Sequence, residues 1–150
     1  MISKLISPQP LNSSVSKSMR SNKGKNTGPE KKIREYLKYY GLRHYKLNKK
    51  GLPGTPDVCF MEEKIAIFIN GCFWHRCPFC NHTLPKHNRT YWKNKFIRNQ
   101  LRDAANRKML KKMGWKPMII WECKLKYHPA SQMKRIFRAM KLQYTDTILQ

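Results

Sequence analysis

The stretch KIAIFINGCFWHRCPFC, residues 64–80, joins a strand pattern directly to a cysteine-rich loop. Its first seven residues are almost continuously apolar, which is typical of a central strand that is covered on both faces. The ten residues after them contain three cysteines, one histidine and three large aromatic side chains. Such side chains serve in a core, in a metal site or in contacts with another molecule, so this loop is a candidate for all three roles.

The segments on either side predict an α/β domain with a small mixed central sheet flanked by helices. Residues 27–40 fit a helix, because Thr27 can cap it, Pro29 suits its first turn and Gly41 can end it. Strands are expected at residues 43–47, 57–61 and 115–123, and a C-terminal helix around residues 133–140. A long helix is expected over residues 91–113, where apolar residues recur every four positions: Ile97, Leu101, Ala105, Met109 and Met113.

The charge of the chain indicates its partner. Its 150 residues include 32 Lys and Arg against 8 Asp and Glu, a formal net charge of +24. A charge of that size opposes compaction and favours a polyanionic partner, for which nucleic acid is the leading candidate. No apolar run is long enough to span a bilayer, and the first residues lack the apolar region of a secretory signal. We therefore expect a cytoplasmic protein that binds double-stranded DNA and does not bind a membrane.

The first 28 residues differ in composition from the rest. They are polar and basic and show no sustained apolar period, and Met19 lies among their cations. We expect a flexible basic arm over residues 1–28 that orders on DNA, followed by a single domain over residues 29–150.

The cysteines predict a structural zinc site. Cys77 and Cys80 have the C-x2-C spacing that is usual for two thiolates on one zinc ion, Cys72 precedes them by five residues, and Cys123 follows a predicted strand. His75, His82 and His87 are rival ligands, and the alternative is a set of reduced thiols without metal. Cys59 lies within an apolar strand and is expected to be a small buried hydrophobe.

Asp57 is a candidate for a catalytic metal site. It follows the turn-rich segment GLPGTP and opens an apolar strand, a position suited to holding Mg²⁺ beside a substrate phosphate. The alternative is an Asp that only caps a turn. The PD at this position is shared with PD-(D/E)xK nucleases, but Glu62 and Lys64, which fit the second half by letter, would lie in the connecting turn.

Several motifs together resemble the Vsr family of very-short-patch-repair endonucleases. They are LPGTPDVCF (52–60), IFINGCFWHRC (67–77), PKHNRTYWKNKFIRNQLRD (85–103) and GWKPMIIWECKL (114–125), and SKSMRSNKGKNTGPE (16–30) is similar to the family's N-terminal segment. The resemblance implies a restriction-endonuclease-like core that nicks one DNA strand 5′ of the thymine in a T:G mismatch. It also implies a bacterial protein that associates with the nucleoid when it acts, and mismatch-repair proteins as partners. Nicking one strand asks only for a monomer.

The resemblance implies a role for individual residues. Asp57 corresponds to the Mg²⁺-binding aspartate and His75 to the histidine that activates the attacking water. Glu30 and Asp103 correspond to further acids of the catalytic site. The positions of the structural zinc ligands are occupied by Cys72, Cys77, Cys80 and Cys123.

The resemblance also implies residues that contact DNA. Phe73, Trp74 and Trp92 correspond to aromatics that wedge into the base stack, and Met19 to an arm residue that reaches the duplex from the minor-groove side. Without the resemblance, Phe73 and Trp74 would be expected in the core, as Trp115 and Trp121 still are.

Two positions depart from the family pattern. Ile69 stands where a metal-proximal threonine is common, so only its backbone carbonyl could bind Mg²⁺. Asn70 replaces a histidine known in some members, and an amide orients water but cannot accept a proton from it near pH 7. Two other functions stay open: a Vsr-like nuclease that nicks a specific unmismatched site, as in restriction or homing, and a zinc-stabilised DNA-binding module without catalysis.

Overall fold

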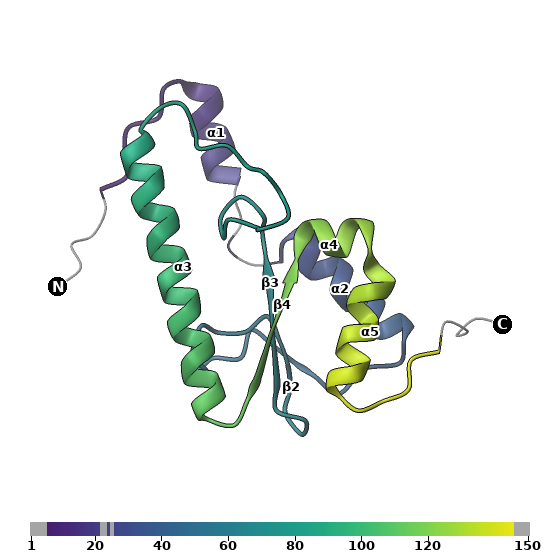
Figure 1. Ribbon diagram of the computed structural model, residues 1–150. Helices are drawn as coiled ribbons and strands as arrows, with labels where there is room; N and C mark the ends of the chain where they lie inside the picture. The colour runs from purple at the N-terminus through teal and green to yellow at the C-terminus, as the bar shows by residue number, and fades with distance from the viewer. Residues whose placement is uncertain (1–5, 22–23, 25, 146–150) are drawn as a thin grey trace.

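The computed structural model describes residues 6–21, 24 and 26–145. Within them one mixed sheet forms, and Figure 1 shows it between the helices. Its strands lie in the order β1 (Lys46–Leu47), β2 (Val58–Phe60), β3 (Ile65–Asn70) and β4 (Lys116–Trp121). β1, β2 and β3 pair antiparallel, whereas β4 runs parallel to β3. A parallel pair needs a crossover, and here it contains the long helix α3 (Arg89–Lys112). The predicted fold class is confirmed.

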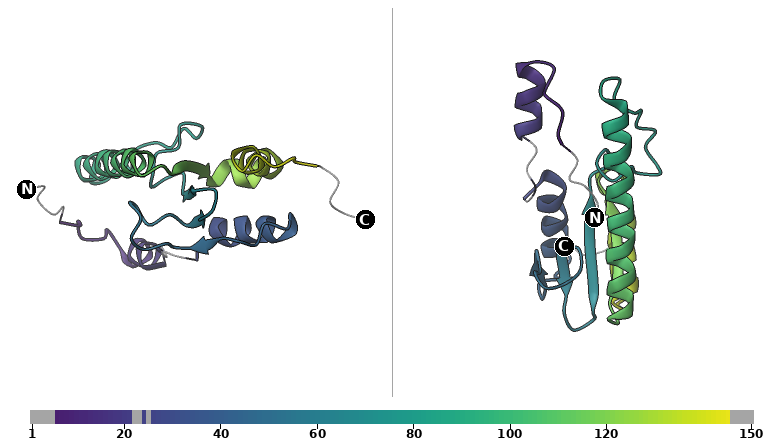
Figure 2. Two further views of the ribbon diagram at one scale, coloured as in Figure 1. Left: turned by 90° about the horizontal axis from the view of Figure 1, so that it is seen from below. Right: turned by 90° about the vertical axis from the view of Figure 1, so that its left-hand side faces the viewer.

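The helices cover both faces of the sheet (Figure 2). α3 lies on one face, and α2 (Gly28–Tyr39), α4 (Glu122–Tyr127) and α5 (Pro129–Ala139) lie on the other. This three-layer arrangement explains why residues 65–69 are apolar at every position, because helices cover both faces of β3.

Alternate residues of the central strands enter two separate cores. Ile65 and Ile67 of β3 pack with Ile33 of α2 and Ile136 of α5, in the larger core. Cys59 of β2 and Ala66 of β3 point to the other face of the sheet. There they pack with Leu110 and Trp115 in a smaller core beside α3. The expectations that Cys59 is a buried hydrophobe and that Trp115 is a core residue are confirmed. Trp121 ends β4 and is only partly buried, so it was wrongly expected in the core.

The four-residue repeat of the long helix correctly predicts α3, but its residues do not face the sheet. Leu101 is 66% exposed and Met109 is 53% exposed, whereas α3 buries Phe96 and Leu110. A step of four residues advances about 400° around a helix with 3.6 residues per turn. A repeat of this kind therefore drifts by about 40° at each step and follows no single face.

Two helices were not predicted. α1 (Ser13–Ser21) forms within the segment expected to be an irregular arm, and the side chain of Asn12 accepts a hydrogen bond from the Val15 amide at 2.9 Å at its start. Such local capping needs no apolar period, which is why the pattern missed it. Met19 lies on α1, but its side chain, like residues 1–5, 22, 23 and 25 of the expected arm, is outside the described part of the chain. α4 begins directly after β4 and carries Cys123 in its first turn.

Among the described residues, no helix combines the length and the apolar character that a membrane span requires.

Candidate active site and metal centre

A cleft of about 1080 Å³ lies at the C-terminal end of β3. The start of α2, the segment before β2 and the middle of α3 form its walls. All four predicted catalytic residues line it: Glu30, Asp57, His75 and Asp103. The fold therefore brings together acids and a histidine that are spread over more than seventy residues of sequence.

Asp57 is held at the floor of this cleft by the sheet. Its backbone N–H donates to the carbonyl of Ile67 at 2.9 Å, just before the point where Val58 of β2 pairs with Ile67 of β3. Its side-chain Oδ2 accepts a hydrogen bond from the N–H of Ile69 at 2.7 Å. Burial raises the pKa of Asp57 to about 6, and the charge of Glu30 adds to this, while the Ile69 N–H and His75 act in the opposite direction. A buried carboxylate of this kind favours a nearby cation.

The backbone of Ile69 faces the same side as Asp57. In a β-strand the N–H and the C=O of one residue point to the same edge, so the Ile69 carbonyl is directed toward β2, as its N–H is. The side chain of Ile69 packs against the larger core. Only its carbonyl is thus available to a ligand in the cleft.

Glu30 enters the cleft from the first turn of α2. Its carboxylate accepts hydrogen bonds from the Asn26 N–H and the Thr27 hydroxyl, each at 2.9 Å. A glutamate that turns back onto the start of its own helix satisfies donors there and interacts favourably with the helix dipole. These bonds fix a carboxylate that is only 7% exposed.

His75 and Asp103 form a pair across the cleft. The imidazole Nδ1 lies 2.5 Å from Oδ2 of Asp103, and Arg102 donates to the other carboxylate oxygen at 3.2 Å. Burial would raise the pKa of Asp103, but the hydrogen bond and charge of His75, together with Arg102, outweigh it and lower the pKa. An ionised Asp103 accepts a hydrogen bond from Nδ1–H of His75, which leaves Nε2 free to accept a proton.

Sequence reasoning missed other residues of the cleft. Glu122 lines it and accepts a hydrogen bond from the Cys72 N–H at 3.3 Å. Arg102 and Arg107 of α3 also line the cleft. Asn70, which the sequence had already indicated, is buried at the end of β3 and lines the cleft too. The position of Glu122 carried a usable signal, because it directly follows β4 and the C-terminal ends of neighbouring parallel strands meet at one edge.

The four predicted zinc ligands come together beside this cleft. The Sγ atoms of Cys72, Cys77, Cys80 and Cys123 all lie within 4.8 Å of one another, and those of Cys77 and Cys123 are 3.6 Å apart. With Zn–S bonds of about 2.3 Å, a tetrahedral site separates its sulfur atoms by about 3.8 Å, so the cluster fits zinc.

Backbone hydrogen bonds also favour thiolates at this centre. The Cys123 N–H donates to Cys72 Sγ and the Phe79 N–H to Cys77 Sγ, each at 3.4 Å. Burial would raise the pKa of Cys77, but the Phe79 N–H and the neighbouring thiols lower it overall. Burial raises the pKa of Cys72, and the hydrogen bond with Cys123 raises the pKa of Cys80, so a bound cation would be needed to hold these two sulfurs as thiolates. Of the rival ligands, His75 is held by Asp103, and His82 and His87 lie outside the cluster formed by the described residues.

The aromatic side chains expected to wedge into DNA form one cluster. The Phe73 ring centroid lies 5.1 Å from that of Trp74 and 5.6 Å from that of Trp92, and the two tryptophan rings are 5.9 Å apart. Each is partly buried, and Trp74 also lines the cleft. The Asn99 side chain donates to the Trp74 carbonyl at 3.0 Å, which ties this cluster to α3.

Comparisons with known proteins agree with this arrangement. Residues 11–81 match the family described as DNA mismatch endonuclease Vsr. The chain is 38% identical over 107 residues to the type II nicking enzyme V.XorIIP of Xanthomonas oryzae pv. oryzae, covering 71% of this chain and 78% of that protein. Over 119 residues it is 35% identical to the type II nicking enzyme V.NmeAIP of Neisseria meningitidis serogroup A, covering 78% and 84%. It is 33% identical over 111 residues to the DNA mismatch endonuclease Vsr of Escherichia coli K12, covering 74% and 70%. The chain therefore belongs to the Vsr family of DNA endonucleases.

Proposed function

We propose that this protein nicks one strand of double-stranded DNA at a T:G mismatch, 5′ of the thymine, in a Mg²⁺-dependent reaction of very-short-patch repair. The observation that carries the proposal is the meeting of Asp57 with the His75–Asp103 pair in one cleft of a Vsr-family chain. The mixed sheet with its flanking helices is the restriction-endonuclease-like core of that family.

The carboxylate of Asp57 and the carbonyl of Ile69 would hold the magnesium ion. Both are hard oxygen donors, and the pKa of Asp57 is raised by burial, with the negative charge of Glu30 adding to it, so a cation beside this carboxylate would favour its ionised form. When bound, the ion would polarise the scissile phosphate and stabilise the leaving oxygen. Glu30 adds negative charge at the same wall of the cleft and so favours a cation there.

His75 would act as the general base. A water molecule attacks phosphorus, its proton passes to Nε2 of His75, and the bond from phosphorus to the 3′ oxygen breaks, after which the 3′ oxygen takes a proton from solvent. The products are a 5′-phosphate and a 3′-hydroxyl. Asp103 holds the ring in the required tautomer and stabilises its protonated form. Asn70 can orient the water by a hydrogen bond but takes no proton.

The aromatic cluster would supply selectivity for the mismatch. Phe73, Trp74 and Trp92 form one cluster, of which Trp74 lines the cleft, and we propose that they insert between base pairs while Met19 approaches from the minor groove. Unstacking a base step costs a few kcal/mol, and the cost is lowest at a mismatch. This difference in unstacking cost would favour binding to mismatched DNA even without hydrogen bonds to each base edge.

The cysteine centre would be structural. Zinc held by the four cysteines would fasten a loop that is too short to build its own apolar core, and His75 lies within this loop. We also propose that residues 1–28 act as a basic arm on the DNA, and that the monomer works in the cytoplasm on the nucleoid with mismatch-repair proteins.

A second candidate substrate is a specific unmismatched site. It is favoured by one observation: relatives with 38% and 35% identity are named type II nicking enzymes. The two candidates are separated by duplexes that carry T:G or C:G at one position within varied flanking sequence. Nicking of T:G duplexes alone supports mismatch repair, whereas equal nicking of the C:G duplex in one context supports the site-specific nuclease.

A further inference from the structure

A second hollow, of about 530 Å³, follows the outer side of α2. We propose that it binds the sugar-phosphate backbone of the DNA that flanks the cleavage site. This inference rests on the proposed function and extends it by naming a contact surface outside the catalytic cleft. The surface, called here the α2 track, consists of four cations: Lys31, Arg34, Lys38 and Arg43.

The spacing of these residues makes a continuous line of charge. Lys31, Arg34 and Lys38 are separated by three and four residues, so they lie on one side of the helix. Ile33 and Leu37 are fully buried on a different side, so α2 packs against the core without covering the track. Arg43 follows the end of α2 and lines the same hollow.

The charge of the hollow suits a polyanion. Apart from the four cations, Glu35 is the charged residue in its lining, and this carboxylate is paired with Lys32 at 3.4 Å on the exposed surface. A concentration of positive charge of this kind binds phosphates by releasing their counterions. Lys31 to Lys38 spans about 10 Å along the helix axis, which matches about three phosphates of one strand at 3.4 Å per nucleotide.

The α2 track is continuous with the catalytic cleft. Lys31 lines both hollows. Arg34 donates to the Asn26 side chain at 3.0 Å, and the Asn26 N–H in turn donates to Glu30, which lies at the wall of the cleft. α2 therefore starts at the cleft and leads away from it, so a strand cut in the cleft can continue along the track.

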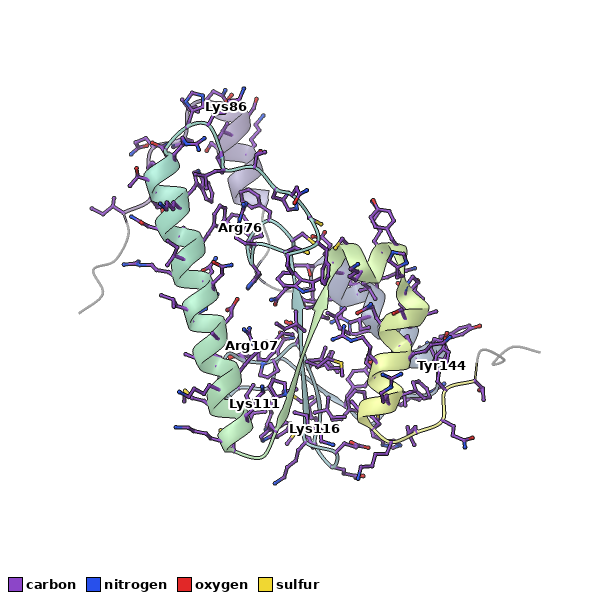
Figure 3. All side chains as sticks on the ribbon, in the orientation of Figure 1. Arg76, Lys86, Arg107, Lys111, Lys116 and Tyr144 are labelled. Carbon is purple, nitrogen blue, oxygen red and sulfur yellow. The ribbon has the colours of Figure 1, made fainter. Side chains whose placement is uncertain are left out.

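The test is the DNA affinity of the double variant Lys38→Gln/Arg43→Gln, which leaves the residues of the cleft unchanged. The matched control is Lys111→Gln/Lys116→Gln, which removes the same charge from exposed lysines at the lower end of the molecule, far from the loop that carries Arg76 and Lys86 (Figure 3). Binding is measured by fluorescence anisotropy over a range of salt concentrations. The probes are a mismatched duplex extending about two helical turns on both sides of the mismatch, and versions cut back on one side or the other.

We expect the track variant to bind the long duplex roughly three- to tenfold more weakly. The salt slope should be smaller by about two units, one for each phosphate that the variant no longer neutralises. The loss of affinity should vanish for the shortened duplex that lacks the DNA lying along the α2 track. It should persist for the duplex that is shortened on the other side of the mismatch. Glu35→Gln should strengthen binding, because it removes the acid of the hollow and frees Lys32.

Three results would overturn the inference while leaving the proposed nuclease function intact. They are an equal loss of DNA affinity in the track and control variants, a loss of affinity that is the same for all duplex lengths, and an unchanged affinity of the track variant. Unchanged affinity in a folded variant would show that the track does not contact the DNA. Failure of the wild-type protein to bind or nick any duplex would instead count against the proposed function. Thermal unfolding of each variant shows that it is folded.

Discussion

Nδ1 of His75, on the cysteine-rich loop, and Oδ2 of Asp103, on α3, lie 2.5 Å apart although 28 residues separate them in the sequence. This pair connects the loop after β3 to the helix on the opposite side of the cleft. If Asp103 orients His75 and stabilises its protonated form, then neutralising Asp103 should slow the nicking reaction without weakening DNA binding.

Asp103→Asn should therefore lower the single-turnover nicking rate by roughly 10²- to 10⁴-fold, the range in which general-base catalysis contributes. DNA affinity should remain near that of the wild type, because surface cations supply most of it. Both quantities are measured on the same mismatched duplex. A nicking rate within twofold of the wild-type rate would remove Asp103 from the mechanism.

The raised pKa of Asp57 predicts how stability depends on pH. The folded protein holds this proton up to a pKa of about 6, against an ordinary value of 3.8, so between these values the folded state binds more protons than the unfolded state. Without metal, the free energy of unfolding should fall as pH rises through this window, by at most about 3 kcal/mol. Asp57→Asn should reduce this loss, which urea unfolding at pH 4 and pH 7 measures.

Magnesium should stabilise the folded protein in a pH-dependent way. Because the ion needs the ionised carboxylate, it should raise the melting temperature more at pH 7 than at pH 5, and not at all in Asp57→Asn. An equal rise at both pH values, or in the variant, would place the ion elsewhere.

Trp74→Ala should weaken the preference for mismatched DNA more than it weakens total affinity. The variant removes the proposed unstacking contact but keeps the Lys and Arg side chains, which supply most of the salt-sensitive binding in protein–DNA complexes. The ratio of affinities for T:G and C:G duplexes measures the effect, and Trp115→Phe in the smaller core is the control for a general loss of packing. An unchanged ratio would show that Trp74 serves the fold alone.

Cys80→Ser should lose zinc and stability together, because three thiolates no longer close a tetrahedral site. Cys59→Ala is the matched control, since it removes a buried thiol of the smaller core that is not part of the cluster. Metal content by mass spectrometry and thermal unfolding are compared for both. A full complement of zinc in Cys80→Ser would contradict the ligand set.

The exposed side of α3 predicts a contrast in stability. Leu101→Ser should change the free energy of unfolding by less than about 0.5 kcal/mol, because Leu101 is 66% exposed. Leu110→Ala should lower it by about 2–5 kcal/mol, because that side chain is fully buried. A large loss from Leu101→Ser would mean that this side of α3 is covered in solution.

The sequence pattern predicted the elements that pack through a simple period. β3 was evident because burial on both faces leaves it apolar, and α2 was evident because its apolar positions and its cap agree. α1 and α4 were missed because short polar helices depend on local caps and on neighbours in space. The face of α3 was unpredictable for the same reason, since only the position of the sheet decides which residues it buries.

The candidate site was predicted unevenly. Asp57 was a candidate because acids are scarce in this chain, and the four cysteines were candidates because a C-x2-C spacing is typical of zinc ligands, whereas the catalytic roles of Glu30, His75 and Asp103 came from the family resemblance. Nothing in the spacing placed Arg107 in the cleft, because its approach depends on how α3 packs against the sheet.

The most direct test of the central claim is a strand-resolved nicking assay on a T:G duplex, with the wild type and Asp57→Asn, in Mg²⁺ or in EDTA. We expect one nick, 5′ of the mismatched thymine, that requires Mg²⁺ and is absent in the variant. Cleavage that persists in EDTA or in Asp57→Asn, or tight binding without cleavage in any sequence context, would contradict it.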